Sequence, residues 1–133
     1  MSNLSDYIEN KIADDLFGRT SYTIPSTFYL ALYTVAPTDT GGGTEATGGS
    51  YARVTVTNNT TNFPSAVGGL KKLATEAVFP TATGSWGTIV AVGLLDAASG
   101  GNLVLHGTLT ASRTIATGDS PKFAADTLTV QFD

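Results

Sequence analysis

An acid, a hydroxyl and the only histidine of the chain fall within eleven positions of the sequence. They are Asp96, Ser99 and His106, in the stretch GLLDAASGGNLVLHG. These side-chain types make a hydrolase site when the hydroxyl is hydrogen-bonded to the imidazole and the acid orients the imidazole. The same stretch can also be two strands joined by a turn, and the two interpretations lead to different classes of protein.

The context of this stretch favours the strand interpretation. No GxSxG elbow occurs in the chain, and Ser99 lies in a run of small residues typical of a turn. His106 lies in a predicted strand, on the face opposite to its leucines, where a histidine is more often a surface or interface residue than a base. Asp96 is suited to begin the turn, and Gly100 and Gly101 can supply positive φ values. We therefore expect neither Asp96 nor His106 to share a hydrogen bond with Ser99.

No other arrangement of residues indicates catalysis or a cofactor. The chain has no cysteine, which removes disulfides and thiolate zinc sites, and one histidine with scattered acids leaves little for another metal. The glycines at 41–43 and 48–49 lack the following Lys-Ser/Thr and the strand-to-helix context of phosphate-binding loops. Acids such as Glu45 and Glu76 have no spacing that suggests a glycosidase, and Trp86 is the only tryptophan. We expect no catalytic residue, no cofactor and no metal.

Charge and hydropathy exclude two further classes of protein. The formal net charge is −4, and the seven Lys and Arg residues form no stripe, so nucleic-acid binding is disfavoured. No apolar run approaches the roughly 20 residues that span a bilayer, and the first residues do not resemble a signal peptide. Most of the polarity comes from uncharged Thr, Ser, Gly and Asn, which fits either a surface covered by copies or partners or an ordinary threonine-rich β domain.

Residues 4–17 are predicted to form one amphipathic helix. Asn3 is a suitable N-cap, and Gly18 follows the last turn as a C-terminal cap. The apolar stripe packs either against the sheet of its own chain or against another subunit, and the sequence leaves both alternatives open. The stripe consists of Leu4, Ile8, Ile12 and Leu16.

After the helix, the apolar pattern changes to a period of two. Strands are expected over 27–35, 51–57, 72–80, 86–95, 102–109, 112–116 and 126–132. Because turn signals separate these strands and no second helix occurs, the pattern predicts a mainly β protein: an antiparallel β-sandwich or jelly-roll-like single domain with one N-terminal amphipathic α-helix. Residues 1–20 carry the helix, as part of the same domain or as a docking arm, and residues 21–133 form the antiparallel β domain.

Two long segments, 36–50 and 58–69, show no periodicity. Loops of this length are uncommon in compact domains unless they bind something or are disordered. We expect the loop 36–50 to be ordered mainly by a neighbouring molecule if it is ordered at all, and a floppy surface loop is the alternative. The loop residues expected to contact a partner are Gly41, Gly42, Gly43 and Thr44.

The motifs LYT, PT, GGSYAR, WGT and GGNL resemble, in this order, a family of small tailed-phage virion proteins usually labelled phage tail fibre protein. Some similar small proteins serve as head decoration or cement. The resemblance covers nearly the whole chain, and residues 58–72 fit it least. It implies a non-enzymatic virion component that is made in the cytoplasm of the bacterial host.

The sequence has none of the repeats expected of an elongated fibre shaft, which favours a compact unit. We therefore expect a capsid decoration or cement protein, and the alternative is a tail fibre or tail-adaptor component, with host-surface glycan binding as a further option. The expected partners are phage capsid or tail proteins and further copies of the chain, with a trimer favoured. We expect the helix stripe and the loop 36–50 to make these contacts.

Overall fold

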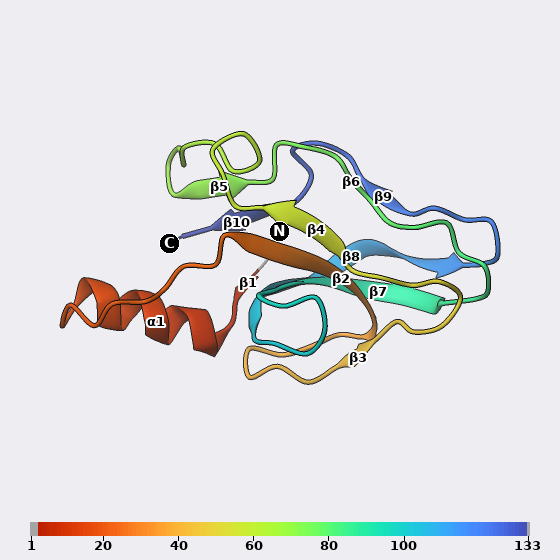
Figure 1. Cartoon of the computed structure of the whole chain (residues 1–133), viewed down its shortest axis with the longest axis horizontal. Coiled ribbons are helices and arrows are strands. Elements are labelled where there is room, and N and C mark those ends of the chain that lie inside the picture. Colours follow the sequence, from red (N-terminus) through yellow and green to blue (C-terminus); the bar gives the residue numbers. More distant parts are fainter. Residues whose placement is uncertain (1–2, 133) are drawn as a thin grey trace.

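The structure is a computed structural model that describes residues 3–132. It is mainly β and antiparallel, and its described part has a single helix near the N-terminus (Figure 1). The elements are β1 (Asn3–Leu4), α1 (Asp6–Leu16), β2 (Thr27–Val35), β3 (Thr44–Glu45), β4 (Val54–Thr57), β5 (Leu70–Lys72), β6 (Ala77–Val78), β7 (Gly87–Leu95), β8 (Leu103–Ile115), β9 (Lys122–Phe123) and β10 (Thr129–Gln131).

The main sheet has six strands in the order β1-β8-β7-β2-β3, and β4 also pairs with β2. Its two central strands, β2 and β7, pair antiparallel from Tyr29 opposite Leu95 to Tyr33 opposite Ala91. β2 is buried on both faces, because four consecutive residues, 30–33, are all buried. The predicted strand 27–35 is confirmed to the residue, and 86–95 is confirmed within one residue.

Two small two-stranded sheets, β5 with β10 and β6 with β9, lie over one face of the main sheet (Figure 1). The core lies between these layers, and Leu32, Ile89 and Phe79 are its most deeply buried large side chains. From the main sheet it contains Leu30, Leu32, Ile89, Val92 and Leu94, and from the covering segments Leu73, Ala77 and Phe79. The predicted mainly β, antiparallel, sandwich-like single domain with one N-terminal helix is confirmed.

The helix begins later than predicted, at Asp6 instead of residue 4. Asn3 and Leu4 pair with β8 as β1, so Leu4 belongs to a strand and Asn3 is not the cap. Ser5 is the N-cap: its Oγ accepts a hydrogen bond from the backbone N–H of Ile8 and donates one to the carbonyl of Leu103. Pairing with a distant strand overrides the local helical pattern here.

Several other predicted boundaries are wrong. The segment 72–80 is not one strand, because β5 ends at residue 72 and β6 begins at residue 77. The predicted strands 51–57 and 126–132 shorten to β4 and β10. The predicted strands 102–109 and 112–116 are one continuous strand, β8.

A large bulge interrupts the pairing of β8 with β7. Ile89 lies opposite Arg113, and Ala91 lies opposite Thr108, so five steps along β8 match two steps along β7. The extra residues of β8, in the segment 109–112, are therefore displaced from the ladder. On its other side, β8 pairs with β1 at residues 105 and 106, and no other strand of the described chain pairs with that edge.

Candidate functional site

The stretch that resembled a hydrolase site is a hairpin turn. The Asp96 carboxylate accepts hydrogen bonds from the Asn102 backbone N–H (2.7 Å) and from the Asn102 side-chain amide (2.9 Å). Gly101 has φ +79°, and a Cβ atom there would lie 2.6 Å from Asp96 Oδ1. The predicted turn and its need for glycine are confirmed.

His106 is paired with Asp39, not with Ser99 or Asp96. Its Nε2 lies 2.8 Å from Asp39 Oδ1, and its side chain is 12% exposed because the loop before β3 covers it. The expectation that Asp96 and His106 share no hydrogen bond with Ser99 is confirmed. The three residues therefore do not form the relay that nucleophilic catalysis requires.

The loop 36–50 is ordered by its own chain, so the expectation that a neighbouring molecule orders it is wrong. Besides the Asp39–His106 contact, the carbonyl of Asp39 accepts a hydrogen bond from the Asp6 N–H at 3.0 Å. Thr38 and Gly41 exchange backbone hydrogen bonds, which closes a tight turn. Thr44 pairs with Val35 in the sheet.

A half-buried ion pair between Arg53 and Glu45 fixes the far end of this loop. Arg53 donates to both carboxylate oxygens of Glu45, at 2.7 and 2.9 Å, and its Nη1 donates to the carbonyls of Ala97 and Gly100. The Tyr51 hydroxyl donates to Glu45 Oε2 at 2.7 Å. The carboxylate of Glu45 is thus occupied within the fold, and the loop, the 96–102 turn and the sheet are held together.

Burial and hydrogen bonding act in opposite directions on Glu45. Burial disfavours the charged carboxylate, but hydrogen bonds from Arg53 and Tyr51 outweigh it and hold the pKa of Glu45 below its ordinary value. The Glu45 carboxylate in turn raises the pKa of Arg53. No sequence spacing indicated this network, because Glu45 lies in the segment 36–50, which has no periodicity, and the other members come from the predicted strand 51–57 and from the 96–102 turn.

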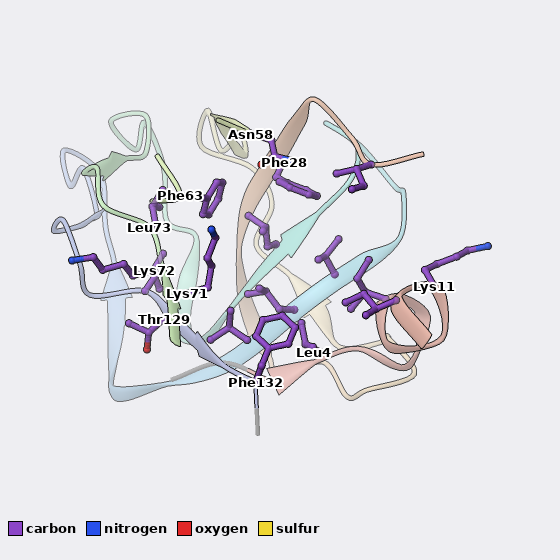
Figure 2. A pocket seen from close by; sticks show the side chains of 18 of the residues that line it. Leu4, Lys11, Phe28, Asn58, Phe63, Lys71, Lys72, Leu73, Thr129 and Phe132 are labelled. Atoms are coloured by element: carbon purple, nitrogen blue, oxygen red, sulfur yellow. The ribbon is translucent and has the colours of Figure 1, made fainter. Parts of the chain in front are cut away.

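The most apolar candidate site is a groove of about 630 Å³ between α1 and the β5–β10 sheet (Figure 2). The floor comes from the main sheet, and one end is closed by Phe28 and Phe63, whose rings meet edge to face. The wall from α1 carries Ile8, Ile12 and Leu16, and the wall from the β5–β10 sheet carries Lys71, Val130 and Phe132. Leu4 of β1 lies beside Phe132 (Figure 2). The groove is therefore built from segments far apart in the sequence.

All four apolar residues of the predicted stripe line this groove, although Leu4 comes from β1. Leu4 is half-buried, and within the helix the exposure rises from 6% at Ile8 to 67% at Leu16. Ile8 therefore packs against the chain's own sheet, which answers the question that the sequence left open for this position. None of Gly41, Gly42, Gly43 and Thr44 lines the groove.

Polar groups are few in the groove, and they lie on its walls. Figure 2 shows the Lys71 side chain pointing into the groove towards Phe63, whereas Lys72 points away from it. Lys72 is paired with Asp126 at 3.1 Å, and no ion pair of Lys71 occurs among residues 3–132. Asp15 lies on the opposite wall. The groove thus offers an apolar floor with one inward-pointing cation.

Two kinds of site do not occur in the described part of the chain. No three His, Asp or Glu side chains of residues 3–132 gather to hold a metal ion. The helix α1, at 11 residues, is too short to cross a membrane. Residues 3–132 contain no helix that is long and apolar enough to do so.

One comparison with known proteins identifies a relationship. The family model described as "Podophage GP4 fiber I protein gp80" matches residues 3–131, which is nearly all of the described fold. A search of curated proteins finds no match.

Proposed function

Because the chain belongs to the family of podophage GP4 fiber I protein gp80, we propose that it is a non-enzymatic structural component of a phage tail fibre. The observation that carries this proposal is the extent of the match, since residues 3–131 include every strand and the helix. The family places the protein in a bacteriophage virion. Its location in the tail and the identity of its partners are our proposal.

The chemistry of the groove supports a protein partner. Its lining is dominated by Leu, Ile, Val and Phe side chains, and a contact of this kind is stabilised by removing apolar surface from water. A glycan would instead need polar groups arranged to bond its hydroxyls, and the floor of the groove offers few. We propose that the protein acts by packing against other fibre or tail subunits and against further copies of itself.

The family description favours the tail-fibre alternative over capsid decoration. We propose a homotrimer as the unit, because oligomers of identical chains close by point-group symmetry. The exposed residues Ile12 and Leu16, together with Gly42 at the loop surface, are the proposed contacts that remain free to meet a partner. Gly43 and Thr44 are also exposed, and we propose them as further contacts, although the backbone of Thr44 pairs with Val35 and Gly43 lies close to the Val35 carbonyl.

A reconstruction of the virion without imposed capsid symmetry tests this proposal. We expect density that fits residues 3–132 at the tail, in a small number of copies arranged as trimers. Density on the capsid shell in hundreds of copies would contradict the fibre assignment and would favour decoration.

A further inference from the structure

The distal half of α1 and the segment that follows it form an arm that stands away from the body of the protein (Figure 1). We define the arm as residues 9–24. Every residue from 9 to 21 is exposed. Exposed apolar side chains lie along the arm: Phe17, near the tip, is 79% exposed, and Ile24, at the end of the returning half, is 64% exposed. An arm of this kind leaves apolar surface in contact with water in the isolated chain.

The arm has a defined shape, because its two halves contact one another. The backbone N–H of Thr20 donates to the carbonyl of Asp14 at 2.9 Å. Tyr22, on the returning half, packs edge to face against Tyr7 at the base of the helix, with ring centroids 6.4 Å apart. A preformed arm loses less conformational entropy on docking than a flexible segment would.

The two acids at the end of the helix lack ion-pair partners among residues 3–132, although the arm also carries the exposed cations Lys11 and Arg19, of which Lys11 lies over the Tyr7 ring. Asp14 and Asp15 lie in the last turn of α1, where the helix dipole disfavours acids, and that turn contains no basic residue. Neither acid takes part in an ion pair among residues 3–132. Across the groove, Lys71 is an inward-pointing cation that likewise forms no ion pair among residues 3–132. The groove and the arm are therefore complementary both in apolar surface and in charge.

From this complementarity we infer that the arm of one copy of the protein docks in the groove of another copy. In this contact, the apolar tip around Leu16 and Phe17 covers the groove floor, and the acids Asp14 and Asp15 approach the partner's Lys71. Because the arm also forms one wall of the groove of its own chain, two copies can exchange arms reciprocally, or each arm can dock in the next copy and close a ring when the rotation permits. The inference rests on the self-association in the proposed function. It does not depend on where in the virion the protein is located.

The test uses the full chain and measures its self-association by sedimentation velocity over a range of concentrations. We expect Phe17→Glu and Lys71→Glu each to weaken association by about tenfold or more. Phe17→Glu places a charge in the apolar contact, and Lys71→Glu places a negative charge opposite the partner's acids. The matched controls are Val35→Glu, an exposed apolar position outside the groove, and Lys122→Glu, an exposed lysine outside it. Both controls should associate like the unchanged protein.

A charge exchange distinguishes docking from a loss of folding. The variant Asp14→Lys/Asp15→Lys should associate poorly although lysines in the last turn favour the helix, and adding Lys71→Glu to the same chain should restore association. Circular dichroism should show the same fold for all variants. A wild-type chain that stays monomeric at all concentrations overturns the inference. An oligomer whose mass none of these substitutions changes also overturns it, and leaves the proposed fibre function standing.

Cross-linking gives a second readout, because the chain has no cysteine of its own. A mixture of Phe17→Cys and Leu70→Cys chains should form a disulfide between the two variants under mild oxidation, since Leu70 lies beside the groove wall on β5. Val35→Cys in place of Phe17→Cys should not form it. Equal cross-linking of the two mixtures would overturn the inference.

Discussion

Arg53 holds Glu45 through both of its carboxylate oxygens, with Nη2–Oε1 and Nε–Oε2 distances of 2.7 and 2.9 Å. The remaining nitrogen, Nη1, donates to two carbonyls of the 96–102 turn. The side chain of Arg53 is 8% exposed, so its charge is compensated almost entirely within the protein. One residue thus links the end of the 36–50 loop to a turn more than 40 positions away in the sequence.

Replacement of Arg53 by alanine should lower the free energy of unfolding by about 2–3 kcal/mol, because it leaves a half-buried carboxylate and two carbonyls without their donor. Arg53→Lys should recover part of this loss, since lysine keeps the charge but not the two-pronged geometry. Urea denaturation measures both. Arg113→Ala, an exposed arginine, is the control and should cost within about 0.5 kcal/mol. An equal cost for the two arginines would contradict the role of Arg53.

The same carboxylate makes stability depend on pH. The pKa of Glu45 is lower in the folded protein than its ordinary value of 4.5, so the unfolded chain binds a proton first as the pH falls. The contribution of Glu45 is fully present above the ordinary value and is lost as the pH falls through the lower, folded value. Denaturation of the wild type and of Glu45→Gln at a series of pH values checks this. The difference between their free energies of unfolding should shrink at acid pH, and a constant difference would refute the assignment.

Asp39→Ala should loosen the loop before β3 without unfolding the protein. The substitution removes the contact with His106, which we expect to contribute about 1 kcal/mol. Hydrogen exchange should become faster at the amides of residues 36–43 and at Asp6, whose N–H bonds the carbonyl of Asp39. Asp126→Ala, which removes another exposed acid from an ion pair, should leave these amides unchanged. Unaltered exchange in Asp39→Ala would mean that the loop is held by its backbone contacts alone.

Two neighbouring glycines provide a matched test of the loop's geometry. Both have positive φ, +77° at Gly42 and +76° at Gly43, so alanine costs about 1 kcal/mol at each from backbone strain. At Gly43 a Cβ atom would also lie 2.6 Å from the Val35 carbonyl oxygen, whereas the space beside Gly42 is open. Gly43→Ala should therefore destabilise the protein by about 2 kcal/mol more than Gly42→Ala in thermal denaturation. Equal melting temperatures would contradict this geometry.

The sequence predicted best those elements whose local pattern and burial agree. The alternation of residues 27–35 produced the strand as observed, because both of its faces are buried and nothing competes with the extended conformation. The turn at 96–102 was also predictable, since Asp96 and Gly101 satisfy it locally. Asn3 and Leu4 were placed wrongly because their conformation is decided by pairing with His106 and Leu105, about a hundred residues away.

The candidate site was only partly predictable, for the same reason. The stripe of residues 4–16 was recognised as a contact surface, but nothing in the spacing indicated the opposite wall, which comes from β5 and β10. The contact between Asp39 and His106 joins residues 67 positions apart, and a single sequence has no signal for such a pair. Apolar patterns show that a face will be covered, but the covering segment is decided by the tertiary fold.

The bulge between β7 and β8 affects whether the sheets of different molecules can pair edge to edge. The exposed edge of a sheet presents a row of free N–H and C=O groups, and strands of other molecules can add to it and grow into aggregates. In β8 the displaced segment 109–112 interrupts that row, so an incoming strand could not match its hydrogen bonds along the whole edge. The bulge therefore lowers the tendency of this edge of the sheet to pair with strands of other molecules.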